Sequence, residues 1–235
     1  MNNDDFVLEY FEDKDFAAKV LESMRKVSEE IFEGARESIP KEFLGYLELF
    51  TLIEQPLMFD RHVVLAIDGR CGSGKTTLAK IVVGVYGGDF ISTDDFYLPF
   101  EFRTPERMLI PGGHINYERF IQQVARPLKA GATKLEYENF NCFTNIATPL
   151  VKDISAKVLV VEGSYSLHPW IRELYNLSAF LDIPDKLQQK RILRRNGAEK
   201  LEMFNKMWIP FEDSYRKAYG IDKYCNLLIN DNNTV

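Results

Sequence analysis

Residues Gly69 to Thr77, with the sequence GRCGSGKTT, combine the residue types that bind a polyphosphate group. Glycines at this spacing let backbone N–H groups turn toward phosphate oxygens, and a following helix N-terminus adds partial positive charge. The Lys75 ammonium can reach the β and γ phosphates, and the Thr76 hydroxyl can bind Mg²⁺. The pattern predicts a loop that binds a nucleoside triphosphate through Gly69, Cys71, Gly72, Ser73, Gly74, Lys75, Thr76 and Thr77.

Two acidic positions follow predicted strands, where ligands bind in an open parallel sheet. Asp94 and Asp95 come at the end of the apolar segment Asp89–Thr93, and one of them can accept a proton from an attacking hydroxyl. Glu162 follows the apolar segment Lys157–Val161, where a carboxylate can hold Mg²⁺ or its water shell. The alternatives are an aspartate that caps a turn and a glutamate that stabilises the phosphate loop by a hydrogen bond.

Three arginines at helical spacing, Arg191, Arg194 and Arg195, predict one basic helix face. Guanidinium groups suit a transferring phosphoryl group, so we expect a helical lid near residues 191–200, with Arg194 favoured over Arg195. The alternative is an ordinary solvated face on which Arg195 pairs with Glu199.

The elements around these residues alternate between strands and helices. His62–Asp68 reads as a buried strand before the loop, and Lys75–Val85 as the helix after it. Further strands are expected at Ser178–Ile183 and Asn226–Asn230, and helices at Tyr117–Lys129, Pro184–Arg195 and Glu199–Tyr219. This alternation of strands and helices predicts an α/β fold of the P-loop NTPase type, a doubly wound parallel sheet of about five strands with helices on both faces. The irregular segment Pro99–Gly113 predicts a binding loop or lid, and a short hairpin is expected around Lys134–Phe140.

Residues 1–60 form a region of different character. They carry 15 acidic and six basic side chains, so their net charge of −9 is more negative than the net charge of −6 of the whole chain. Helical patterns at Asp15–Glu33 and Lys41–Glu54 predict an N-terminal helical extension. We expect these helices to cover an edge or face of the nucleotide-binding domain, with dimerisation or regulation as the alternative.

Composition and charge exclude several classes of function. An acidic chain without a basic stripe argues against a nucleic-acid partner, and the lack of a run of about 18 apolar residues argues against a membrane span. No signal-peptide pattern begins the sequence, and Cys71, Cys142 and Cys225 are too far apart for a zinc site or a disulfide framework. We expect a cytoplasmic protein with reduced thiols and a small-molecule substrate, and a homo-oligomer is left open.

These motifs together resemble the uridine kinase and phosphoribulokinase family of P-loop small-molecule kinases, which also includes nicotinamide riboside and bacterial pantothenate kinases. The likeness spans about Val63–Asn230 and rests on GRCGSGKTT, ISTDDFYLP, NYERF, VEGSYSLHP and the arginine-rich segment at 191–197. The resemblance implies transfer of the γ-phosphoryl group of ATP, with Mg²⁺, to a hydroxyl of a small metabolite. It also implies that residues 61–235 form the kinase domain and its lid.

The resemblance assigns roles to single residues. Asp94 matches the general base, Glu162 the Walker B carboxylate and Arg194 a lid arginine. Candidate acceptor-binding residues are Tyr97, His114, Asn116 and Phe140. Asn116 stands where nucleoside kinases of this group place an aspartate that binds ribose hydroxyls, and the segment around Phe140 lacks their histidine pattern. The acceptor is therefore open among nucleoside-like molecules, pantothenate, sugars and sugar phosphates.

Two other classes of protein are alternatives to a kinase. A GTPase switch needs an Asn-Lys-x-Asp base reader, and Asn205-Lys206 continues into Met207-Trp208 within a predicted helix. A non-catalytic protein that binds ATP through the phosphate loop remains the alternative to the kinase, and the choice between ATP and GTP is open.

Overall fold

The computed structural model describes residues 44–141 and 144–230. The helix predicted at Asp15–Glu33, the beginning of the helix predicted from Lys41, and Cys142 lie outside the described residues. The described part of the second predicted helix is α4 (Leu44–Leu57), which ends three residues later than expected, beyond Glu54.

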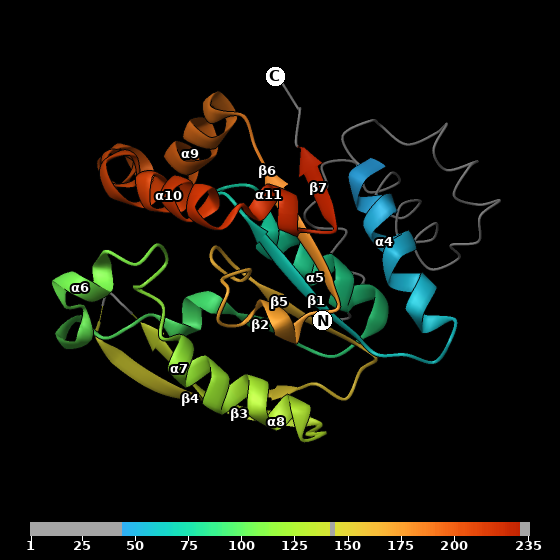
Figure 1. Ribbon diagram of the computed structural model, residues 1–235. Coiled ribbons are helices and arrows are strands. Elements are labelled where there is room, and N and C mark those ends of the chain that lie inside the picture. The colour runs from blue at the N-terminus through green and yellow to red at the C-terminus, as the bar shows by residue number, and fades with distance from the viewer. Residues whose placement is uncertain (1–43, 142–143, 231–235) are drawn as a thin grey trace.

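Five parallel strands form the central sheet, in the order β2-β5-β1-β6-β7 (Figure 1). Their bounds are Val63–Gly69 for β1, Phe90–Ser92 for β2, Val158–Glu162 for β5, Leu177–Asp182 for β6 and Leu227–Asn230 for β7. Each strand coincides with an apolar segment that the sequence predicts. The predicted α/β fold with a parallel five-stranded sheet is therefore confirmed.

Both faces of the sheet are covered, because side chains of the central strand alternate between two cores. Leu65 of β1 belongs to a core that α4 and α5 (Lys75–Tyr86) complete, with Phe50 and Ile81 among its buried members. Ala66 points to the opposite core, which contains Phe120 and Tyr215 from helices on the other face. Figure 1 shows α4 and α5 side by side on the first face.

One long helical run crosses the region where the sequence predicts two helices. It consists of α9 (Asp185–Met203), a π-helical segment η6 (Phe204–Trp208) and α10 (Ile209–Tyr219), and we call it the helical arm. The break that the sequence predicts between the two helices corresponds to a kink at Gly197, whose φ of 82° and ψ of 171° are not helical. Glycine adopts this conformation readily because it has no Cβ, so the arm bends there without ending.

Two prolines explain the π-helical segments. One segment, η4 (Ile121–Ala125), joins α7 (Tyr117–Phe120) to α8 (Arg126–Lys129), and the other is η6 of the helical arm. Each segment ends two residues before a proline, Pro127 or Pro210. Proline has no N–H, and its ring clashes with the carbonyl four residues earlier, so a locally wider turn relieves the clash.

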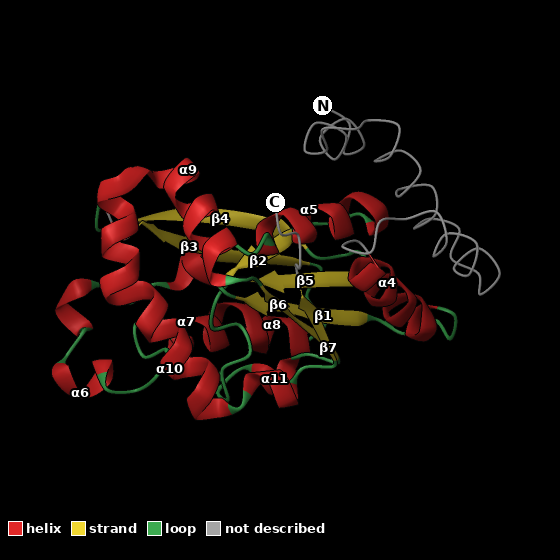
Figure 2. Ribbon diagram, turned by 90° about the horizontal axis from the view of Figure 1, so that it is seen from above, coloured by secondary structure: helices red, strands yellow, loops and turns green. Residues whose placement is uncertain are grey.

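A two-stranded antiparallel hairpin stands apart from the main sheet. Its strands are β3 (Lys134–Asn141) and β4 (Ile146–Asp153), which confirms and lengthens the hairpin expected around Lys134–Phe140. Leu135 and Tyr137 alternate with exposed residues along β3 and pack into the second core. Figures 1 and 2 show the hairpin and the helical arm at the same end of the sheet.

Short helices occupy several connections. Their bounds are Thr93–Phe96 for η2, Phe100–Phe102 for η3, Pro105–Met108 for α6, Arg172–Leu174 for η5 and Ile221–Tyr224 for α11. The predicted irregular segment Pro99–Gly113 therefore contains η3 and α6. Among the helices of residues 44–141 and 144–230, none combines the length and the apolar character that a membrane crossing requires.

Candidate functional site

The predicted phosphate loop connects the end of β1 to the start of α5, as its strand and helix flanks require. Gly69 has a φ of 153°, and a Cβ at this position would lie 2.4 Å from the carbonyl oxygen of Leu181 in the neighbouring strand. Gly74 has a φ of 95° and precedes the first residue of α5. Only glycine fits both places without strain, so the local sequence dictates a tight turn between β1 and α5.

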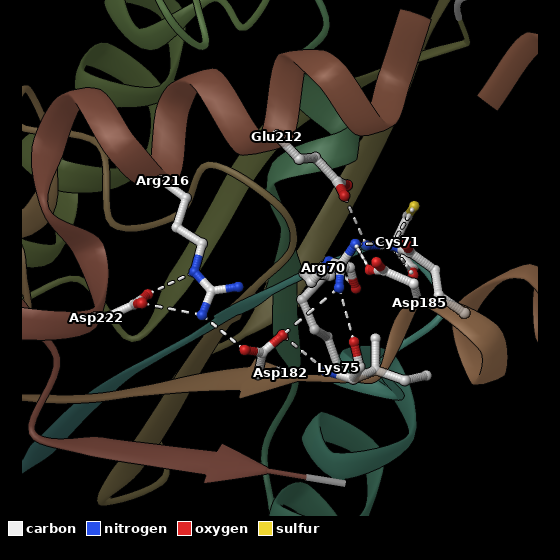
Figure 3. A network of polar contacts seen from close by, with 10 residues as sticks. Arg70, Cys71, Lys75, Asp182, Asp185, Glu212, Arg216 and Asp222 are labelled. Carbon is white, nitrogen blue, oxygen red and sulfur yellow. Dashed lines mark hydrogen bonds and ion pairs between the residues drawn. The ribbon is translucent and has the colours of Figure 1, made fainter. Parts of the chain in front are cut away.

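Two cationic residues of the loop contact protein groups. The Lys75 ammonium donates hydrogen bonds to the carbonyl oxygens of Gly69, at 2.8 Å, and Arg70, at 3.0 Å. The Arg70 guanidinium donates to the carbonyl of Ile183 at 2.8 Å and forms an ion pair with Asp185 at 2.7 Å. Figure 3 shows Arg70 directed toward the residues that follow β6. Arg70 therefore anchors the loop, whereas Lys75 lies folded along it.

The helical arm holds the loop from the other side. Glu212 of α10, which is only 8% exposed, accepts a hydrogen bond from the Cys71 N–H at 2.9 Å and another from the Ser164 hydroxyl at 2.8 Å. Gln188 of α9 donates to the Cys71 carbonyl at 3.0 Å. Burial and the neighbouring Glu212 carboxylate raise the pKa of the Cys71 thiol to about 12. Cys71 is thus a neutral, buried part of the loop.

Salt bridges extend this contact into the sheet. Arg216 of α10 binds Asp182, at the end of β6, and Asp222, each at 2.6 Å (Figure 3). Asp182 in turn lies 3.9 Å from the Arg70 guanidinium. The loop, the end of β6 and the helical arm are therefore joined by one polar network.

Thr76 and Glu162 supply oxygen atoms suited to Mg²⁺. The Thr76 hydroxyl, in the first turn of α5, donates to the carboxylate of Glu162, the last residue of β5, at 3.1 Å. Burial raises the pKa of Glu162, and the nearby Asp94 adds to this rise. Within the described residues, no three His, Cys, Asp or Glu side chains form a ready-made metal site. Mg²⁺ sites in phosphoryl-transfer enzymes use one or two protein oxygens together with substrate phosphates, so this pair fits the ion.

The structure separates the two adjacent aspartates by their surroundings. Asp95 accepts a hydrogen bond from the Tyr137 hydroxyl at 2.9 Å, and so faces the hairpin. Asp94 is exposed and lines the cavity, and desolvation by the surrounding protein raises its pKa, while Lys75 and Arg195 oppose the rise. Both aspartates line the cavity, but the Asp95 carboxylate is engaged by Tyr137, so Asp94 is the better placed of the two to meet a ligand.

The phosphate loop, the acidic residues, the hairpin and the helical arm surround one cavity of about 930 Å³. Such a volume suits a nucleotide together with a small molecule. Of the residues predicted from the sequence, the cavity is lined by Cys71, Gly72, Ser73, Gly74, Lys75, Thr76, Thr77, Asp94, Asp95, Tyr97, Phe140, Glu162, Arg191 and Arg195. Gly69, Arg194, His114 and Asn116 do not line it.

The arginines of α9 divide between the cavity and the solvent. Arg191 and Arg195, one helical turn apart, line the cavity, and Arg191 donates to the Gly72 carbonyl at 3.2 Å. Arg194 is exposed outside the cavity. This placement differs from the expectation that favoured Arg194, and the lid role assigned to that residue stays a prediction. The ordinary pairing of Arg195 with Glu199 is replaced by a 2.8 Å hydrogen bond to Asn196.

His114 and Asn116 have structural surroundings. His114 is buried among aromatic rings, with its ring centre 5.7 Å from that of Tyr97 and 5.5 Å from that of Trp208. Burial lowers its pKa to about 3, so the imidazole is neutral. Asn116 caps α7, because its side-chain oxygen accepts from the Arg119 N–H at 3.0 Å. His114 thus supports the cavity wall formed by Tyr97 rather than lining the cavity.

Several residues that line the cavity are not predicted from the sequence. Ser164 and Tyr165 follow Glu162 at the end of β5, and the rule that pointed to Glu162 would also have pointed to them. Tyr46, Trp208 and Glu212 reach the cavity only through tertiary packing of α4 and the helical arm. Their helical patterns contain no local signal of such a role.

No family model matches the chain. A phosphoribulokinase of Synechocystis is 25% identical over 146 residues, which are 60% of this chain and 44% of that protein. Uridine-cytidine kinase C of Dictyostelium discoideum is 28% identical over 115 residues, 49% of this chain and 26% of that protein. The chain thus spans less than half the length of either relative.

A solved structure described as a possible uridine kinase from Bacillus stearothermophilus superposes with a TM-score of 0.54 at 21% identity, covering 72% of this chain and 89% of the other. At this identity the likeness shows the fold alone, an α/β fold around a parallel five-stranded sheet. The predicted resemblance to uridine kinases and phosphoribulokinase is therefore confirmed. These similarities support a kinase reaction and leave the acceptor open.

Proposed function

We propose that this chain transfers the γ-phosphoryl group of ATP to a hydroxyl of a small, nucleoside-like metabolite. The observation that carries the proposal is the convergence of Lys75, Thr76, Glu162 and Asp94 on one cavity whose lining also includes aromatic rings. The first three residues suit a polyphosphate with its metal, and Asp94 suits a reacting hydroxyl. The proposal includes the cytoplasmic location expected from the lack of a membrane span and of a signal-peptide pattern in the sequence.

In this proposal the reaction is a direct transfer. The acceptor oxygen forms a bond to the γ-phosphorus while the bond from that phosphorus to the β,γ-bridging oxygen breaks. Asp94 accepts the proton of the acceptor hydroxyl, and its raised pKa makes it a stronger base than a fully solvated aspartate. Bound Mg²⁺ supplies charge neutralisation between the β and γ phosphates, with Thr76 and Glu162 as the residues that would hold it.

Cationic side chains neutralise the transferred group. Lys75 moves from the carbonyls it now contacts to the phosphate oxygens, which are stronger acceptors. Arg191 and Arg195 line the cavity from the helical arm and are placed to stabilise charge that develops in the transition state. We favour Arg195 over Arg194 for this role, because Arg195 is near enough to Asp94 to lower its pKa.

The aromatic side chains in the cavity lining support a planar acceptor. Tyr97, Phe140 and Trp208 contribute rings, and Asn139 and Asn141 line the cavity beside Phe140. Aromatic faces with nearby polar side chains suit a base and its sugar, since ring stacking and a few placed hydrogen bonds give orientation. We therefore favour a nucleoside-like acceptor over a compact sugar or sugar phosphate.

A screen of acceptors tests the proposal. The chain is incubated with ATP and Mg²⁺ and with separate nucleosides, sugars, sugar phosphates and vitamin precursors, and both ADP and the mass of the product are measured. D94N is the matched control, because it keeps the phosphate loop and removes the proposed base. Phosphorylation of one acceptor by the wild type alone supports a kinase. ATP binding without any phosphorylated acceptor across a broad panel would instead indicate a non-catalytic nucleotide-binding protein.

A further inference from the structure

The helix that precedes the P-loop domain brings an aromatic residue to the phosphate loop. Tyr46 of α4 is half-buried and lines the cavity together with Gly74, Thr77 and Ile81. A Cβ added to Gly74 would lie 4.0 Å from the Tyr46 hydroxyl oxygen, so the ring reaches the beginning of α5. Gly74 and Thr77 belong to the predicted phosphate loop, so Tyr46 lies beside residues expected to hold phosphate.

The direction of a bound nucleotide follows from the loop. Lys75 serves the β and γ phosphates, and the backbone of a phosphate loop holds the α and β phosphates. The γ phosphate must face Asp94, where the acceptor reacts. The α phosphate and the nucleoside therefore extend the other way, past Thr77 at the beginning of α5.

Tyr46 and Ile81 lie on that side. Ile81 follows Thr77 by one helical turn and is 3% exposed, with its remaining surface in the cavity wall. Tyr46 packs on the core that α4 shares with α5, which holds its ring beside the loop. An aliphatic surface next to an aromatic ring suits the base or ribose of a nucleotide.

We propose that Tyr46 contacts the nucleoside portion of ATP, so that α4 completes the nucleotide site of the P-loop domain. The proposal rests on the proposed function, because it takes the direction of the nucleotide from the place of Asp94. It gives the N-terminal region a role in binding ATP, in addition to covering the sheet.

Nucleotide affinity with and without a nucleoside tests this assignment. Calorimetry with Mg²⁺ compares ATP with inorganic tripolyphosphate, which has the phosphates only. Loss of one aromatic contact weakens binding about threefold to tenfold. We expect Y46L to weaken ATP binding by this factor and to leave tripolyphosphate binding unchanged, while Y46F keeps the wild-type affinity for both if the ring makes the contact.

Tyr86 provides a matched control. Its ring packs on Phe50 of α4 with 5.9 Å between ring centres, and its hydroxyl donates to Glu54 of α4 at 2.6 Å, but it does not line the cavity. Y86L should therefore loosen α4 without changing ATP affinity. The nucleoside contact would be refuted if Y86L and Y46L weakened ATP binding equally. It would also be refuted if Y46L weakened the binding of ATP and of tripolyphosphate by the same factor.

The proposed function and this inference fail in different ways. If the wild-type chain binds neither ATP nor GTP, the proposed function fails. If it binds ATP and Y46L binds it equally well, only the role of Tyr46 is lost. Should Y46L fail to fold, Y46W replaces it, and its fluorescence relative to the wild type should change with ATP and stay constant with tripolyphosphate. A constant signal with both ligands overturns the inference.

Discussion

Glu212 offers the sharpest test of how the phosphate loop is held. Its two carboxylate oxygens accept separate hydrogen bonds, from the Cys71 N–H at 2.9 Å and from the Ser164 hydroxyl at 2.8 Å, in a buried place. In E212Q the amide oxygen can still accept from Cys71. The new NH₂ group can donate to Ser164, whose proton can then turn to the Gly69 carbonyl at 3.1 Å. Every buried polar group therefore keeps a partner in this variant.

E212A removes the acceptor and leaves the Cys71 N–H buried and unpaired. Such a group costs about 1–3 kcal/mol, and a lost bond to a charged acceptor places the value near the upper end. We expect E212A to lower the free energy of unfolding by about 2–3 kcal/mol and E212Q by less than about 1 kcal/mol. For a domain of this size, 1 kcal/mol corresponds to about 2–4 °C in Tm, so E212A should melt at least about 4 °C lower.

Thermal and urea unfolding without nucleotide measure these differences. E202A is the matched control, because Glu202 lies on the same helical arm and pairs only with the exposed Lys206, and its effect should stay within about 0.5 kcal/mol. Equal losses in E212Q and E212A would mean that charge, and not hydrogen bonding, is what Glu212 contributes. No loss in E212A would mean that Glu212 does not stabilise the loop.

The other predictions concern chemistry and reactivity. D94N should bind ATP, but its turnover number should be about 10²–10⁴-fold lower than that of the wild type. Because a general base must be deprotonated, wild-type turnover should fall as the pH drops through the raised pKa of Asp94. Unchanged turnover in D94N would remove Asp94 from the mechanism. R195A should lower turnover about 10²-fold, whereas R194A should stay within about twofold because Arg194 does not line the cavity, and the reverse order in steady-state assays would contradict this. The Cys71 thiol has a pKa of about 12, so it should react with iodoacetamide at pH 8 far more slowly in the folded than in the unfolded chain. Peptide mass spectrometry follows this reaction. Equal rates would show that the thiol is not buried.

The sequence predicted the parts of the site that depend on strand ends. Glu162 and Asp94 meet the phosphate loop because the carboxyl ends of parallel strands share one edge of the sheet. Apolar runs and glycine spacing locate those ends, so the fold and the loop followed from local patterns. Lys75 and Thr76 came with the loop itself.

The rest of the site depends on packing that local patterns do not encode. Which of Arg194 and Arg195 faces the cavity is set by the rotation of the helical arm, and that rotation depends on the kink at Gly197 and on the contacts of α9 with the loop. His114 is surrounded by four rings from three segments: Tyr97, Tyr165, and Trp208 and Phe211 of the helical arm. Asn116 illustrates a different difficulty, because an asparagine before a helix serves as a cap as readily as a ligand.

The position of β1 in the middle of the sheet sets when this site can form during synthesis. β1 leaves the ribosome early, but its two neighbours begin at Val158 and Leu177. The loop also needs Glu212, which comes later still. Pairing over such long sequence separations is slow, and a nascent chain exposes an unpaired apolar strand until it occurs. The nucleotide of the proposed function therefore cannot protect the growing polypeptide, and chaperone contact during translation should concentrate on the segment from β1 to α5.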